Sequence, residues 1–206
     1  MDLTFHGASC LRLRGREIEV VIDPHDRWHS SKGRLGPDIV VRTEGATSPE
    51  RLRPAPGRPQ EVSGPGEYEI RGVAIFGLPA AEVTIMRVEV DEVRVVSLGK
   101  LKRQLSEEEI EALGHIDVLA IPVGGGDALG ATEAAKLVNT MEPPVVVPVR
   151  YRTSEADGGS QYDTIARFAK EMGLPEGWST SPKLTLSGSM AATEESRVVI
   201  LEPRER

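Results

Sequence analysis

The groups best suited to metal or acid–base chemistry in this sequence are its few histidines and the carboxylates near them. The chain has four histidines, His6, His25, His29 and His115. In the stretch DPHDRWH, His25 and His29 flank Asp26 and follow Asp23, and imidazole with carboxylate is a donor set that zinc accepts. Because this spacing matches no established metal motif, a solvated loop is the favoured interpretation.

The stretch DIVVRTEGATSPER, residues 38–51, is a second candidate for chemistry. An apolar run ends here in a polar loop, and in open α/β sheets ligands bind beyond the carboxyl ends of the strands. The loop holds no histidine and no cysteine. It therefore lacks the side chains of a typical zinc site.

Several segments resemble one known family. LTFHGASCLRLRGREIEVVIDP, SGPGEYEIRGV, SLGKLKRQLSEEEIEALGHIDVLAIPVGGG and EPPVVVPVRY follow one another like segments of the metallo-β-lactamase-fold hydrolases. They are most similar to the small bacterial branch of Zn-dependent hydrolases. The resemblance covers roughly residues 2–203. It implies an α/β fold, the four-layer αββα sandwich, which the order of the expected elements also suggests.

The resemblance also implies where the metal ligands of the family would lie. The HxHxDH motif falls on Glu44, Ala46, Ser48 and Pro49, and the ligands of the later and early stretches fall on Lys100, Arg103, Arg150 and Ala8. Alanine and proline have no side-chain donor for zinc, and lysine and arginine put fixed positive charge where a dication would lie. We therefore expect no metal, no cofactor and no catalytic residue, only a vestigial site formed by Asp23, Glu44, Ala46, Ser48, Lys100, Arg103 and Arg150.

The cationic residues of this vestigial site could result from random sequence drift after the metal was lost, or they could have one of two roles. In the favoured one, Lys100 and Arg150 pair with Glu44 and Asp23, because carboxylates left without a metal need a counter-charge. In the alternative, the cations hold an anionic ligand. Between Gly77 and Val83 the chain is also shorter than its relatives, which would trim a loop over the site.

Other reactive residues have simpler explanations. Cys10 alternates within an expected strand and is typical of a small buried hydrophobic residue. The Gly124–Gly125–Gly126 run lacks the lysine and serine or threonine of a phosphate-binding loop, so we interpret it as a tight turn. His6 ends an expected strand, and His115 follows a helix end, where histidine is favourable without any catalytic role.

The elements that must position these residues follow from apolar patterning. We expect strands over 3–5, 10–13, 18–22, 38–41, 118–123, 145–149, 183–186 and 197–201, a strand pair joined near Arg71–Gly72, and a hairpin about Asp91–Glu92. We expect helices over 106–113, 132–140 and 162–172, the first with a capping box at Ser106, and a helix start at Ser48–Pro49. A β-rich first half thus precedes alternating strands and helices.

Length and composition restrict the class of protein. The chain of 206 residues has a formal net charge of −7, which disfavours sequence-independent nucleic-acid binding. We expect one domain over residues 1–206, no membrane span, no signal peptide, and a cytoplasmic location consistent with a single cysteine.

Together these observations predict a metallo-β-lactamase-fold protein that has lost its zinc site and keeps a binding, regulatory or scaffold role. The first alternative is a hydrolase with a rebuilt or displaced site. The second is a subunit that pairs with an active relative. The ligand and the oligomeric state stay open.

Overall fold

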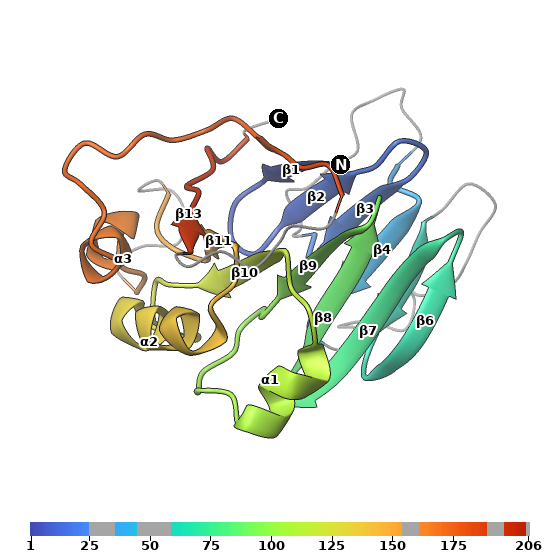
Figure 1. The fold of residues 1–206 in the computed structure, drawn as a ribbon, viewed down its shortest axis with the longest axis horizontal. Coiled ribbons are helices and arrows are strands. Elements are labelled where there is room, and N and C mark those ends of the chain that lie inside the picture. The colour runs from blue at the N-terminus through green and yellow to red at the C-terminus, as the bar shows by residue number, and fades with distance from the viewer. Residues whose placement is uncertain (25–35, 45–58, 154–160, 189–195, 205–206) are drawn as a thin grey trace.

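The computed structural model describes residues 1–24, 36–44, 59–153, 161–188 and 196–204 and consists of two β-sheets with helices (Figure 1). The first sheet has the order β12-β1-β2-β3-β4-β5. Its strands are β1 (Asp2–Phe5), β2 (Leu11–Arg14), β3 (Glu19–Ile22), β4 (Ile39–Arg42), β5 (Gln60–Ser63) and β12 (Leu184–Thr185). Within it, β3, β4 and β5 run parallel to one another.

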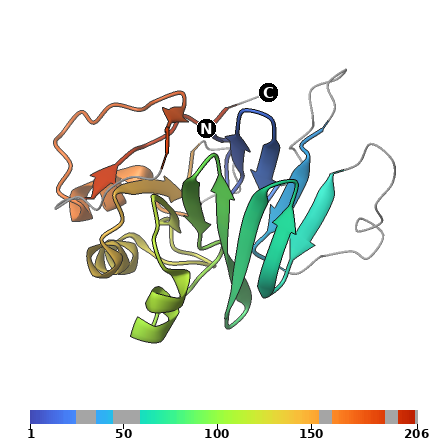
Figure 2. The ribbon, with the colours of Figure 1, turned by 45° about the vertical axis from the view of Figure 1, so that its right-hand side comes forward.

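The second sheet has the order β13-β11-β10-β9-β8-β7-β6. Its strands are β6 (Gly66–Ile70), β7 (Val73–Ala80), β8 (Val83–Val90), β9 (Val93–Ser97), β10 (Val118–Pro122), β11 (Val145–Val149) and β13 (Arg197–Val198). The described helices α1 (Glu107–Leu113), α2 (Ala131–Met141) and α3 (Ile165–Glu171) follow β9, β10 and β11 in turn. They lie on the side of this sheet that faces away from the first sheet (Figures 1 and 2). None of the helices in the described ranges is long and apolar enough to cross a lipid bilayer.

The core lies between the two sheets, where alternate residues of both point inward. Leu3 and Leu13 of the first sheet and Val88 and Val95 of the second belong to one cluster of buried residues. Strands β10 and β11 are buried at every position because helices cover their outer face, which is why their sequences are apolar throughout rather than alternating. The predicted two-sheet sandwich is confirmed for the described residues.

Most predicted elements are present within one to three residues of their expected ends. Ser106 accepts a hydrogen bond from the backbone of Glu109, and the Glu109 side chain completes the capping box of α1. The hairpin turn at Asp91–Glu92 has both residues at positive φ, as a two-residue hairpin turn requires. Strand β5 was not predicted. The predicted helix start at Ser48–Pro49 lies outside the described residues.

The two sheets approach each other closely at the edge where β4 and β9 end. Gly99 has a φ of +55°, and a Cβ added there would lie 2.2 Å from the Thr43 hydroxyl oxygen. The backbone amide of Thr84 also donates to the Thr43 carbonyl, at 2.8 Å. Glycine at position 99 thus satisfies two conditions, a left-handed backbone and a contact too tight for a side chain.

Replacing Gly99 tests this contact. We expect Gly99→Ala to lower the free energy of unfolding by about 2–4 kcal/mol, because it adds a steric clash to the left-handed penalty. Gly7→Ala is the matched control, since Gly7 has a φ of +85° with nothing within 4 Å of an added Cβ, and it should cost about 1 kcal/mol. Urea unfolding of both variants measures the difference, and equal losses would contradict the close approach of the sheets.

Candidate functional site

The candidate site lies at the edge where five strands end. Asp23 follows β3, Thr43 and Glu44 follow β4, Lys100 follows β9, Asp127 follows β10, and Arg150 follows β11. The loops of both sheets meet here, since the Arg150 amide donates to the carbonyl of Ala8 in the β1–β2 loop, at 2.7 Å. Ala8, Asp23 and Arg150 all have positive φ, a conformation that costs energy in residues other than glycine.

Asp23 is held by Thr43, which follows the adjacent strand β4. Its carboxylate accepts hydrogen bonds from the Thr43 amide at 2.8 Å and from the Thr43 hydroxyl at 2.7 Å. Burial, with a smaller contribution from the nearby charge of Glu44, raises the pKa of Asp23 to about 6 against the lowering effect of the two Thr43 hydrogen bonds. Asp23 is thus a carboxyl group that titrates near neutral pH.

Lys100 lies between carboxylates from the two sheets. Its ammonium nitrogen is 2.8 Å from Glu44 Oε2 and 3.7 Å from Asp127 Oδ2. The Lys100 and Glu44 side chains are 31% and 43% exposed, so this contact is partly screened by water. The predicted pairing of Lys100 with Glu44 is present.

Arg150 makes the most buried ion pair of the site. Its side chain is 11% exposed, and its Nε and Nη2 donate to the two oxygens of Asp127 at 2.9 and 2.6 Å. Nη2 also donates to the Tyr162 hydroxyl at 3.2 Å, and that hydroxyl donates to Asp127 at 3.0 Å. The guanidinium carbon lies 5.6 Å from the Tyr162 ring centre. This two-pronged, stacked arrangement uses geometry that a lysine could not supply.

These contacts determine what the carboxylates can do chemically. Burial raises the pKa of Asp127, but the hydrogen bonds and charge of Arg150, with contributions from Tyr162 and Lys100, outweigh it and lower the pKa to about 2. A carboxylate with so low a pKa is a poor general base at neutral pH. Asp127 is therefore suited to holding Arg150 and Lys100 rather than to accepting a proton.

Arg150 does not pair with the partners predicted for it. Glu44 or Asp23 was the expected partner, whereas the guanidinium binds Asp127, which directly follows the Gly124–Gly126 run. Gly125 and Gly126 both have positive φ, so the tight turn was predicted correctly. The feature of the sequence that could have identified Asp127 as this partner is its place shortly after a fully buried strand, at the same edge as Arg150. Tyr162 gave no such signal.

Arg103 does not pair with Glu44 or Asp23 either. Its two terminal nitrogens bind both carboxylate oxygens of Glu109, at 2.7 and 2.6 Å, and this pairing lowers the pKa of Glu109 to about 2. The capping box brings Glu109 back toward the start of α1, within reach of Arg103. Ala46, Ser48, Pro49, His25, Asp26 and His29 lie outside the described residues. His6 contacts Thr4 at 3.1 Å and His115 contacts Asp117 at 3.0 Å.

The described residues of the site do not suit a metal ion. Nowhere in the described ranges do three or more His, Cys, Asp or Glu side chains gather in a way that could hold one. Glu44 and Asp127 are both directed at the Lys100 ammonium, and Asp23 directs both of its oxygens at Thr43. A dication near Lys100 and Arg150 would be repelled by both.

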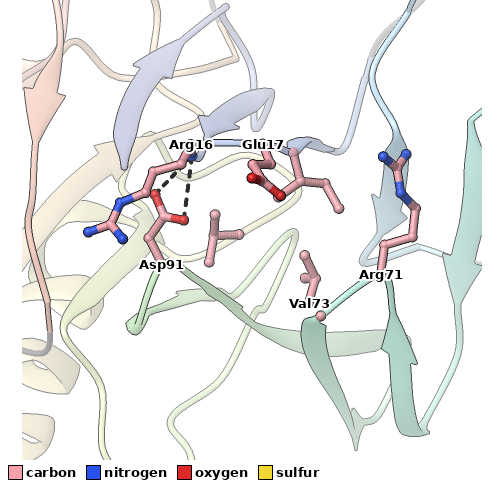
Figure 3. A pocket seen from close by; sticks show the side chains of 8 residues that line it. Arg16, Glu17, Arg71, Val73 and Asp91 are labelled. Atoms are coloured by element: carbon pink, nitrogen blue, oxygen red, sulfur yellow. Dashed lines mark hydrogen bonds between the residues drawn. The ribbon is translucent and has the colours of Figure 1, made fainter.

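A separate hollow of about 360 Å³ lies at the opposite edge, between the turns that precede β3, β7 and β9 (Figure 3). Ile18, Val73 and Val90 contribute its apolar lining. Around its rim, the Asp91 carboxylate accepts from the Arg16 amide at 3.1 Å, and Arg71 pairs with Asp38. The guanidinium groups of Arg16 and Arg71 point away from each other (Figure 3), so they do not converge on one ligand.

Comparison with known proteins places the chain in a family. The model of the beta-lactamase superfamily domain matches residues 2–150, which include every strand of the candidate site. The chain belongs to the beta-lactamase superfamily.

Two curated relatives and one solved structure illustrate the superfamily membership. A UPF0173 protein of Pyrococcus furiosus is 44% identical over 184 residues, covering 76% of this chain and 87% of the relative. A UPF0173 metal-dependent hydrolase of Thermococcus onnurineus is 32% identical over 100 residues, covering 43% of this chain and 45% of the relative. A Thermotoga maritima protein of the metallo-beta-lactamase superfamily has a TM-score of 0.78 at 24% identity over 98% of both chains. The last likeness concerns the fold.

The raised pKa of Asp23 predicts a particular pH dependence of stability. The folded protein holds a proton at Asp23 up to a pH of about 6, whereas the unfolded chain loses it near pH 4. Wild-type stability should therefore fall through this group as pH rises from about 4 to 6, by up to about 3 kcal/mol, and then level off. Asp23→Asn keeps an acceptor for the Thr43 amide and should lack this component.

Unfolding by urea at pH 4.5 and at pH 7.5 measures the effect. Asp163→Asn is the control, because Asp163 is 42% exposed and pairs with Arg167 one helical turn away. If Asp23→Asn and the wild type differ equally at both pH values, the carboxyl group is not the titrating group described here.

Proposed function

We propose that this chain is a metal-free member of the beta-lactamase superfamily with a binding, regulatory or scaffold role rather than a metal-dependent hydrolase. The observation that carries the proposal is the Lys100 ammonium, 2.8 Å from Glu44 and 3.7 Å from Asp127. It lies at the strand-end edge where the resemblance would place metal ligands. Relatives named as metal-dependent hydrolases set the expectation from which this site departs.

The chemistry of the other side chains supports a non-catalytic role. Asp127 is held as a carboxylate of low pKa by Arg150, so it does not activate the Tyr162 hydroxyl that it contacts. Lys100, Arg150, Glu44, Asp127 and Asp23 together carry two positive and three negative charges once Asp23 is ionised. This balance gives an anionic ligand no advantage, which argues against the anionic alternative.

A rebuilt hydrolase is the second candidate, and one observation favours it. Asp23 has a pKa of about 6, which is in the range useful for a general acid or base. It would act through a water molecule or a substrate hydroxyl at the same edge. Loss of any hydrolytic activity in Asp23→Asn, with the fold intact, is the result that would favour this candidate.

Metal content tests the main proposal directly. Protein purified, incubated with excess zinc or manganese and then desalted should carry well below one metal ion per chain. Elemental analysis of the desalted protein gives the answer. Retention of about one metal per chain that is lost in His25→Ala or His29→Ala would overturn the proposal in favour of the DPHDRWH loop as a displaced metal site.

Chelation provides an independent prediction. In proteins with a structural metal, the free energy of metal binding contributes directly to folding, so chelators lower their melting temperature. Here the aliphatic core between the sheets should fold without any metal. We expect the melting temperature to be the same with and without EDTA, measured by circular dichroism after prolonged incubation. A clear decrease with EDTA that added zinc reverses is the contrary result.

A further inference from the structure

The positions of Lys100 and Arg150 depend on backbone features that prepare each side chain. Lys100 follows Gly99, whose left-handed backbone lies against Thr43, so the chain turns toward the first sheet just before the lysine. Arg150 itself has a φ of +52°, and its amide is fixed to the carbonyl of Ala8. Each cation is thus carried on a turn that both sheets constrain.

The carboxylates at this edge depend on these cations. Glu44 comes from the first sheet and Asp127 from the second, and Lys100 contacts both. Arg150 donates to both oxygens of Asp127. Without these cations, Glu44 and Asp127 would be left at this edge as unpaired negative charges, which repel each other.

We infer that Lys100 and Arg150 supply, as covalent parts of the chain, the two positive charges that a bound dication would otherwise supply to the carboxylates of this edge. The edge is then held together across the two sheets without a free cation. The inference rests on the proposed function only in taking the site as metal-free. Beyond that, Lys100 and Arg150 are the residues that balance the negative charges of Glu44 and Asp127.

The competing explanation is that Lys100 makes an ordinary surface ion pair of little energetic value. The chain provides a close comparison two residues away. Lys102 pairs with Glu82 at 3.3 Å, and these side chains are 58% and 82% exposed. Lys102 faces one carboxylate in open solvent, whereas Lys100 faces two.

The test compares Lys100→Met with Lys102→Met, because methionine keeps the apolar stem and removes the charge. We expect Lys100→Met to raise the equilibrium constant of unfolding about tenfold and Lys102→Met to leave it nearly unchanged. Adding Glu44→Gln to Lys100→Met should recover part of the loss, because the unpaired carboxylate is then removed. Equal, small effects of the two lysine variants would overturn the inference.

Added divalent cations give a second readout. Manganese or magnesium chloride should raise the melting temperature of Lys100→Met, since an external cation can now approach Glu44 and Asp127, and should not do so for Lys102→Met or the wild type. A rise of equal size in the wild type would overturn the inference, because the position between Glu44 and Asp127 would then be open to a cation even with Lys100 present. Metal retained by the wild type after desalting bears instead on the proposed function.

Arg150 is tested with its own comparison. Arg150→Lys keeps the charge but loses the paired hydrogen bonds, so it should destabilise the protein less than Arg150→Met does. Arg204→Met is the control, because the Arg204 guanidinium donates to the Pro182 carbonyl in an exposed position. If Lys100→Met does not fold, folding of Lys100→Arg would support the charge requirement, and failure of Lys100→Arg as well would overturn it.

Discussion

The structure depends on charge balance at the one edge where the strands of both sheets end. Asp23, Glu44 and Asp127 bring carboxylates to this edge, and carboxylates that lie close together repel one another, which costs stability. Lys100 and Arg150 offset this cost directly, through contacts of 2.8 and 2.6 Å. The tight packing of Gly99 on Thr43 brings the two sheets together next to Lys100 and Glu44, whose contact joins them.

The rest of the fold provides the rigid support for that edge. Strands β10 and β11, buried at every position, carry Asp127 and Arg150 on adjacent parallel strands. Parallel neighbours end at the same side of a sheet, so a residue just after each is within reach of the other. The positive φ values at Ala8, Asp23 and Arg150 show that the backbone is strained here, and the surrounding sheets keep these conformations in place.

On the proposed function, the same arrangement distinguishes this chain from the metal-dependent hydrolases named among its relatives. A dication needs several lone pairs directed at one point, and fixed positive charges close by weaken its binding. Here the carboxylate oxygens are directed at an ammonium, a guanidinium and a threonine. The oxygen atoms and the positive charges around them suit the cationic side chains of Lys100 and Arg150.

The sequence by itself determined the two-sheet sandwich, most element boundaries, and the position of Lys100 beside Glu44. The periodicity of apolar residues, the turn residues and the capping box are local signals. The family resemblance then indicated how these elements are arranged. Only the tertiary structure decided that Arg150 binds Asp127, that Arg103 binds Glu109 instead of the site, and that Tyr162 stacks on Arg150. These partners lie up to 23 residues apart along the chain. Which carboxylate a guanidinium selects depends on distances of a few ångströms between loops, and no local pattern in the sequence encodes those distances.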